Sequence, residues 1–272
     1  MGFQDFLRKR VVTSHIEECI DSIPKPVGSF GYDPWGYEVD GIKTAMGAFK
    51  PIYDKYFRVT AYGLENIPKT GPVLIICNHG GQIPFDGGLV AYALATNSHA
   101  PRAPRGMIER VFPTLPFIGN LVNKAGSVIG DPVNCAKMLD NDEAVIVFPE
   151  GARGAGKPFS KRYQLQRFGN GFMHLAITKN TPIIPVGIAG CEESMPSAGN
   201  FSYLAKKLGV PYVPIMFPVP LPTKVILRFG ELMSFSGEIH NEKEVEGKVE
   251  QVKDVIRDLI DEGLAEKKGW FQ

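Results

Sequence analysis

The segment from Val73 to Asp86 constrains the fold of this chain more than any other. It opens with five apolar residues, Val-Leu-Ile-Ile-Cys, and changes at Asn78 and His79 to a glycine-containing sequence. A short apolar run of this kind is typical of a strand that is buried on both faces of a parallel sheet. Open α/β sheets place their chemistry where such strands end, so we expect a functional site around His79.

His79 and Asp86 flank the loop that follows the expected strand. Two glycines allow a tight exit from the strand, and Pro84 suits the first turn of a helix that begins near Phe85 or Asp86. In one continuous helix, rising about 1.5 Å per residue, the pair would lie roughly 10 Å apart, too far for a hydrogen bond. We therefore expect a loop to bring the two side chains together.

An imidazole that is held by a carboxylate can take a proton from an alcohol near neutral pH. No serine or cysteine lies next to His79 or Asp86 in the sequence, which favours direct attack by a substrate hydroxyl over a covalent enzyme intermediate. The alternative is that Asp86 only caps a helix and that His79 is an ordinary loop histidine.

Composition excludes several classes of function. The 30 basic and 29 acidic side chains nearly cancel, so the overall charge gives no indication of nucleic-acid binding. The four cysteines are scattered without metal-ligand spacing, which predicts reduced thiols in an intracellular protein and no zinc site. No run of 18 or more apolar residues is present, so any membrane contact is expected at the surface, peripheral and on the cytoplasmic face.

Residues 1–58 are predicted to form an amphipathic, helical extension that contacts a membrane, and residues 59–272 are predicted to form the main domain, including a C-terminal helix. Residues 3–20 carry a modest amphipathic pattern, and 23–41 are rich in proline and glycine. Residues 42–58 show apolar side chains at helical spacing among lysine and arginine, with an expected kink at Pro51. This helix either packs on the core or rests in a lipid interface.

From Val59 onward, apolar strand patterns alternate with helical ones, which predicts an α/β fold with a largely parallel central sheet flanked by helices. Expected strands lie at 59–62, 73–77, 126–129, 144–148, 183–188 and 224–229. Expected helices lie at 88–95, 107–123, 134–139, 171–179 and 242–268, with a polar, glycine-rich loop at 149–167.

A second motif, Phe-Pro-Glu-Gly-Ala-Arg, follows the strand that ends at Phe148. Since parallel strands end at the same edge of a sheet, Glu150 and Arg153 are expected to share a crevice with His79 and Asp86. The guanidinium suits a phosphate or carboxylate, and Gly151 allows close approach. The alternative is a solvated basic loop.

Residues 151–157 also fit the spacing of a nucleotide-binding P-loop that ends at Lys157. Pro158 stands where the Ser or Thr that binds magnesium is required, and no helical pattern follows. The P-loop interpretation is therefore disfavoured.

Three blocks together resemble the signature of the glycerolipid acyltransferase family, which includes lysophosphatidic acid acyltransferases. They are Asn78-His79 with Asp86 beyond it, residues 148–153, and Ile-Pro-Val-Gly from Ile184. The resemblance covers roughly residues 60 to 190. It implies transfer of a fatty acyl group from a thioester, acyl-CoA or acyl carrier protein, to a hydroxyl of a glycerolipid, with no metal or other cofactor.

Carried over residue by residue, the resemblance implies that His79 is the general base and Asp86 its orienting partner. The implied substrate-binding residues are Asn78, Glu150, Gly151, Arg153 and Pro185.

The sequence departs from the family pattern at two places. Six residues separate His79 from Asp86 instead of four, as in members resembling diacylglycerol acyltransferases. Asp131 stands near the place where an arginine usually meets the acceptor phosphate. A phosphate-bearing acceptor would then rely on Arg153, with Arg105, Lys124 or Lys157 as further candidates, or the acceptor carries no phosphate. The same motifs would also suit a lipid- or acyl-CoA-binding protein without turnover, or a thioesterase.

Overall fold

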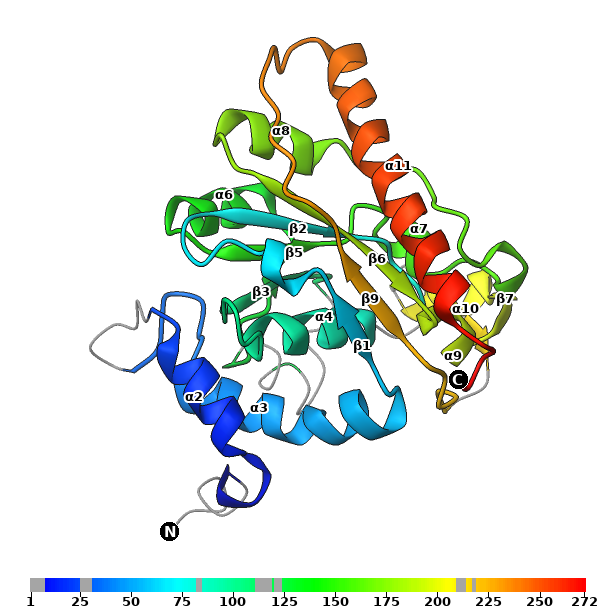
Figure 1. The fold of residues 1–272 in the computed structure, drawn as a ribbon. Coiled ribbons are helices and arrows are strands. Elements are labelled where there is room, and N and C mark those ends of the chain that lie inside the picture. The colour runs from blue at the N-terminus through cyan, green and yellow to red at the C-terminus, as the bar shows by residue number, and fades with distance from the viewer. Residues whose placement is uncertain are drawn as a thin grey trace.

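The computed structural model describes residues 8–24, 31–81, 85–110, 119, 124–208, 214–216 and 219–272. Its centre is a seven-stranded sheet in the order β1-β9-β6-β2-β5-β3-β4 (Figure 1). The strands are β1 (Thr60–Tyr62), β2 (Val73–Cys77), β3 (Pro104–Ile108), β4 (Val128–Ile129), β5 (Ala144–Val147), β6 (Ile183–Ala189) and β9 (Ile226–Phe229). A separate antiparallel pair is formed by β7 (Ser197–Asn200) and β8 (Pro214–Met216).

The sheet is mostly parallel, which confirms the predicted fold class. Strands β6, β2, β5, β3 and β4 run in one direction. The β9 strand pairs antiparallel with β6 and parallel with β1, so β1 and β9 run the other way. The carboxyl ends of β2 and β5 therefore lie at the same edge.

Helices cover both faces of the sheet, and β2 shows why its sequence is apolar throughout. Val73, Ile75 and Cys77 face one core, whereas Leu74 and Ile76 face the other. The first core is covered by α3 (Val39–Pro51) and α4 (Phe85–Ala95), and the second by α6 (Pro132–Asp140), α8 (Gly171–Thr178) and α11 (Glu242–Glu266). A strand buried on both faces alternates its side chains between two helical layers.

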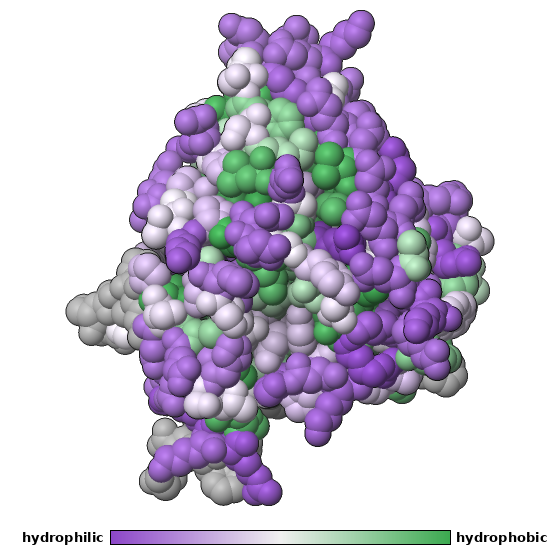
Figure 2. Space-filling model, in the orientation of Figure 1, coloured by the Kyte–Doolittle hydropathy of each residue, from purple (hydrophilic) through white to green (hydrophobic). Residues whose placement is uncertain are grey.

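The last helix closes the second layer. Its buried side chains recur at helical spacing, and hydrophilic residues cover its outer side (Figure 2). Asn241 caps the amino terminus by accepting a hydrogen bond from the backbone N–H of Glu244. None of the helices in the described ranges has both the length and the apolar composition needed to cross a bilayer.

The N-terminal helices differ from the sequence prediction. The expected helix over 3–20 is interrupted: residues 8–11 form a helical turn, and α2 runs over Ser14–Ser22. Thr13 causes the break, because its side chain accepts a hydrogen bond from the backbone N–H of Ile16 and caps α2. Residues 1–7 lie outside the described part of the chain.

The helix expected over 42–58 is α3 followed by a π-helical turn, Ile52–Tyr56. The change occurs at Pro51, which has no N–H to donate to the preceding turn. Its aromatic side chains Phe49, Tyr53 and Tyr56 pack against the first core, and Phe57 is buried in it. The apolar face thus packs on the protein, which is the first of the two alternatives for this segment.

One predicted helix is wrong over its first residues. Met107 and Ile108 belong to β3, where they pair with β4, and the preceding part of β3 pairs with β5. Pairing with strands on both sides satisfies the backbone hydrogen-bonding groups of this segment. These contacts outweigh the weak helical pattern of its sequence. Most of the remainder of the predicted helix, residues 111–118 and 120–123, lies outside the described residues. The glycine-rich loop at 149–167 contains two single turns of helix, α7 (Ala152–Ala155) and a 3-10 turn at Phe159–Lys161.

Candidate active site

Asn78 fixes the point at which the chain leaves the sheet. Its side-chain N–H donates to the carbonyl of Ile188 at 3.0 Å, and its side-chain oxygen accepts from the N–H of the same residue at 2.7 Å. The amide thus continues the β2–β6 pairing one step beyond Cys77. Because Asn78 is buried and held at both ends, the backbone of His79 starts from a defined position at the sheet edge.

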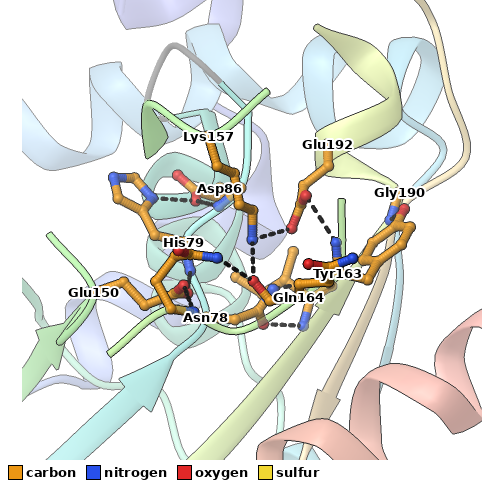
Figure 3. A network of polar contacts seen from close by, with 12 residues as sticks. Asn78, His79, Asp86, Glu150, Lys157, Tyr163, Gln164, Gly190 and Glu192 are labelled. Carbon is orange, nitrogen blue, oxygen red and sulfur yellow. Dashed lines mark hydrogen bonds and ion pairs between the residues drawn. The ribbon is translucent and has the colours of Figure 1, made fainter. Parts of the chain in front are cut away.

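The loop brings His79 and Asp86 into contact, as the sequence predicted. His79 Nδ1 lies 2.6 Å from Asp86 Oδ2 (Figure 3). The same carboxylate accepts the backbone N–H of Gly80 at 3.0 Å and that of Gly87 at 2.8 Å. Asp86 lies in the first turn of α4 and is fully buried, whereas 14% of the His79 side chain is exposed. The contact with Asp86 engages Nδ1 and not the second ring nitrogen, Nε2.

The electrostatic environment favours the charged imidazole. Burial is the largest effect and lowers the pKa of His79, but Asp86 raises it through its charge and its hydrogen bond. Glu150 also raises this pKa, and Lys157 lowers it. The net result is a pKa above the ordinary value for histidine. A carboxylate on one ring nitrogen therefore fixes the tautomer and stabilises the imidazolium that forms when Nε2 takes a proton.

Glu150 links the two motifs from inside the protein. Its Oε1 accepts the backbone N–H of His79 at 2.9 Å, and its Oε2 accepts that of Gln166 at 2.7 Å. The side chain is buried, so both of its oxygens bind the protein's own backbone. Gly151 follows with a φ of 55° and ψ of −145°, a combination that side chains disfavour, and begins α7.

Arg153 and Pro185 lie in different surroundings. Arg153 is exposed on α7, and its guanidinium donates to the carbonyl of Arg167 at 3.3 Å. Pro185 is buried within β6, paired with Ile76 of β2. Its carbonyl accepts the N–H of Gly230 at 2.8 Å. The structure therefore brings the two motif loops together and places Pro185 in the sheet behind them.

The other basic residues considered for an acceptor phosphate have partners within the protein. Arg105 is buried in ion pairs with Asp33 and Glu143. Lys124 pairs with Glu38 at 3.0 Å. Asp131, which stands in place of the usual arginine, caps α6 by accepting the N–H of Val133 at 2.8 Å.

Sequence reasoning missed Glu192, which comes from α9 (Cys191–Ser194). It is buried beside the dyad loop and forms an ion pair with Lys157 at 2.8 Å. The available signal was two adjacent glutamates shortly after the end of the apolar β6 strand, which is where a parallel sheet places its chemistry. Among the residues that the structure describes, no group of three or more His, Cys, Asp or Glu side chains is placed to hold a metal ion.

Residues 58–189, which contain the dyad and the Glu150 motif, match the model of the Acyltransferase family. This part of the chain, with its His-Asp pair at the end of a parallel strand, thus matches an acyltransferase domain, and the match is consistent with the glycerolipid acyltransferase family.

Two relatives are similar to this chain in sequence, and one solved structure is similar to it in fold. An uncharacterized protein of Mycobacterium tuberculosis is 37% identical over 215 residues, which cover 75% of this chain and 59% of that protein. The chain thus spans less than two thirds of that relative. The "DGAT1/2-independent enzyme synthesizing storage lipids" of Bos taurus is 28% identical over 240 residues, 86% of this chain and 67% of that enzyme. The fold matches the crystal structure of the 1-acyl-sn-glycerophosphate (LPA) acyltransferase PlsC from Thermotoga maritima, with a TM-score of 0.53, 21% identity, and coverage of 84% and 83%.

Proposed function

We propose that the chain transfers a fatty acyl group from an acyl thioester, acyl-CoA or acyl carrier protein, to a hydroxyl of a lysophospholipid or other glycerolipid. The observation that carries the proposal is the contact between His79 Nδ1 and the buried Asp86 carboxylate at the end of β2. This contact leaves Nε2 as the base. The match of residues 58–189 to the Acyltransferase family model supports acyl transfer as the reaction class.

In the proposed reaction, neutral His79 accepts the proton of the lipid hydroxyl at Nε2 while the oxygen attacks the thioester carbonyl. The C–S bond then breaks, the new ester forms, and the thiolate leaves and takes the proton from the imidazolium. General base assistance of this kind contributes about 10²- to 10⁴-fold to the rate. The thioester is already activated, so the proposal includes no metal or redox cofactor.

The remaining motif residues divide into two groups in this proposal. Asn78 and Glu150 position the backbone of His79. The Asn78 amide does so by binding the backbone of Ile188. The Glu150 carboxylate accepts the backbone N–H groups of His79 and Gln166. Gly151 and the exposed Arg153 bind the acceptor. Pro185 supports the pocket from behind, within β6.

A second candidate function is acylation of a neutral glycerolipid, such as monoacylglycerol or diacylglycerol. The observation that favours it is the use of Asp131 as the cap of α6 and of Arg105 as a buried ion-pair partner. Asp131 is an anion that would repel a phosphate, and the charge of Arg105 is already paired with Asp33 and Glu143. The name of the bovine relative, an enzyme that synthesises storage lipids, points in the same direction.

A panel of acceptors tests both candidates. The full chain is incubated with radiolabelled acyl-CoA, or acyl carrier protein, and with lysophosphatidic acid, other lysophospholipids, monoacylglycerol or diacylglycerol in mixed micelles. Acylated lipid supports the proposal, and the preferred acceptor decides between the two candidates. Free fatty acid without acylated lipid indicates a thioesterase, and binding of the donor without its consumption indicates a binding protein.

Peripheral contact with a membrane, at the cytoplasmic face of an intracellular bilayer, is part of the proposal because the acceptor is a lipid. Since the aromatic face of α3 is packed on the core, we assign this contact to exposed apolar side chains around the β7–β8 pair and the C-terminus. Lys206 and Lys207 of α10 (Ser202–Leu208) lie beside them in sequence and suit anionic headgroups. The exposed apolar residues are Phe201, Tyr203, Ile215, Val219, Trp270 and Phe271. Sedimentation with phosphatidylglycerol vesicles, compared with phosphatidylcholine vesicles, tests this contact.

A further inference from the structure

A pair of buried, oppositely charged side chains lies behind the dyad loop. Lys157 Nζ is 2.8 Å from Glu192 Oε1, and the two side chains are only 4% and 6% exposed (Figure 3). Lys157 follows α7, and Glu192 belongs to α9, so the pair joins two segments that flank the dyad. Neither side chain has a role in the reaction proposed above.

Glu192 is in direct contact with the loop that carries the dyad. A Cβ atom built on Gly80 would lie 2.4 Å from Glu192 Cγ, so the carboxylate side chain packs against the bare backbone of Gly80. The N–H of Gly80 in turn donates to Asp86 at 3.0 Å. A continuous series of contacts therefore leads from Lys157 through Glu192 and Gly80 to Asp86.

The carboxylates of Glu192 and Glu150, both buried, attach residues 157–166 to the loop that carries the dyad. Glu192 Oε2 accepts the N–H of Tyr163 at 2.9 Å, and Lys157 Nζ donates to the carbonyl of Gln164 at 3.3 Å. Glu150 joins Gln166 of the same loop to His79. The loop is thus fixed to the dyad at both of its ends.

The charges at this position need a reason beyond packing. Removing two ionised groups from water is costly, and well-packed apolar side chains hold a loop at least as well. A buried charge acts over a longer range than a methyl group, because the protein interior screens it weakly. The titratable imidazole of His79 lies within reach of this effect.

We propose that the Lys157–Glu192 ion pair is a positioning pair for the His79–Asp86 dyad. Glu192 holds Gly80, and with it the hydrogen bond to Asp86, while Lys157 supplies a positive charge that balances the carboxylates around the imidazole. The proposal rests on the proposed acyl transfer and assigns two further residues to the same site.

Several elements contribute the groups that act on His79. Asp86 and Glu150 raise the pKa of His79, and Lys157 lowers it, against the background of burial, which lowers it most. Removal of Lys157 should therefore raise this pKa, and removal of Glu192, which leaves the lysine charge unbalanced, should lower it. The titratable and charged groups around the dyad are Asp86 from α4, Cys77 from β2, Glu150 after β5, Lys157 after α7, and Cys191 and Glu192 from α9.

The test is a histidine titration by NMR on the full chain, because it reports on His79 whether or not the enzyme turns over. The variants are Lys157→Met, Glu192→Gln and the double variant, and His79→Ala assigns the resonance. We expect the midpoint for His79 to rise by about half a pH unit in Lys157→Met and to fall by about as much in Glu192→Gln. The double variant should return toward the native midpoint. Unmoved midpoints, or shifts in the same direction, overturn the proposal.

A neighbouring ion pair provides a matched control. Lys267 and Glu193 form a similarly buried pair, in which the glutamate is the neighbour of Glu192 on α9. The double variant Lys267→Met/Glu193→Gln should leave the midpoint for His79 in place. A shift as large as that of the Lys157 and Glu192 variants would show that general loosening of α9 is responsible, and it would overturn the proposal.

Activity gives a second readout. We expect the acid limb of kcat/KM to move with the NMR midpoint in each single variant. In the Lys157→Met/Glu192→Gln double variant, which contains no buried charge without its partner, we expect about tenfold lower kcat at nearly unchanged KM. This double variant decides the matter if a single variant does not fold, since an unchanged kcat overturns the proposal. If the native chain transfers no acyl group but the midpoints move in opposite directions, the proposed function fails and the electrostatic role of the pair stands.

Discussion

Two clusters of buried charge lie at opposite ends of the same strand, β5. Before the strand, Glu143 and Asp33 hold Arg105, and after it, Glu150 belongs to the group around His79. Both clusters join segments that are distant in sequence. They differ first in exposure: the Arg105 cluster is buried, whereas the His79 ring is partly exposed.

The Arg105 cluster fixes the N-terminal extension to the sheet. Asp33 accepts the backbone N–H groups of Trp35 and Tyr37 at 2.9 Å each, and the guanidinium lies over the Tyr37 ring at 4.6 Å. An arginine keeps its charge at every physiological pH, so this cluster holds one state. A histidine changes its charge near neutrality, so the cluster at the other end of β5 can move a proton. The comparison shows that one buried cluster holds a permanent charge, whereas the other holds a group that can exchange a proton with its surroundings.

The largest expected effect is the loss of activity on removal of the imidazole. In His79→Ala, acyl transfer should fall by about 10²- to 10⁴-fold, because the general base is lost. The free energy of unfolding should fall as well, because the fully buried Asp86 loses its charged partner, although it keeps the hydrogen bonds from Gly80 and Gly87. Assays of kcat/KM and urea denaturation measure the two quantities, with His174→Ala, at a partly exposed histidine of α8, as the control. Unchanged acyl transfer would show that His79 is not the base, and the two clusters would then no longer differ in function.

The next prediction concerns stability and the Arg105 cluster. Arg105→Met leaves two buried carboxylates without their cation, so the free energy of unfolding should fall by about 3–5 kcal/mol. Activity per folded molecule should stay close to that of the native chain, because Arg105 contacts none of the dyad residues. Chemical denaturation and an assay below the unfolding transition give these values. A stable but inactive Arg105→Met variant would contradict the assignment of this cluster to structure alone.

A smaller effect is expected from crowding at Gly80. The Cβ of Gly80→Ala would lie 2.4 Å from Glu192, which forces the loop or the carboxylate to shift, and overpacking of this kind costs about 1–3 kcal/mol. The loss should appear in kcat as well as in stability, since the N–H of residue 80 binds Asp86. Gly87→Ala is the matched control, because its Cβ meets only the Phe148 ring at 3.6 Å. Equal losses in both variants would mean that the contact with Glu192 is unimportant.

The titration of His79 should be visible in the pH dependence of the reaction. The base is the neutral imidazole, so kcat/KM should fall about tenfold per pH unit below the pKa of His79. Burial lowers this pKa and Asp86 raises it, with a net rise, which places the acid limb above the ordinary histidine value of about 6.5. In Asp86→Asn the limb should move to lower pH while the maximum rate drops. A limb that stays in place in Asp86→Asn would assign it to another group.

The sequence predicted the His79 end of β5 better than the Arg105 end for a physical reason. Strand β2 is apolar on both faces and is followed by a short loop, so local pattern alone places His79 and Asp86 at the sheet edge. Arg105 meets Asp33 and Glu143 from 72 and 38 residues away, and no local periodicity records such contacts. The same holds for Lys157 and Glu192, and for β3, whose pairing with β4 and β5 decides its conformation. Residues that follow a local strand-to-loop pattern were predictable, and those placed only by contacts between distant segments were not.

The smallest effect comes from an ion pair at the surface, and it tests whether burial sets the scale of the others. Lys179 and Asp140 lie 2.7 Å apart, a distance similar to those in the buried clusters, but 31% and 53% of their side chains are exposed. Water and salt screen such a pair, so Lys179→Met should change the free energy of unfolding by about 0–1 kcal/mol, and less in high salt. Urea denaturation at low and high NaCl, run beside Arg105→Met, measures the difference. If Lys179→Met cost as much as Arg105→Met, short contact distance would outweigh burial, and the contrast between closed and open clusters would lose its physical basis.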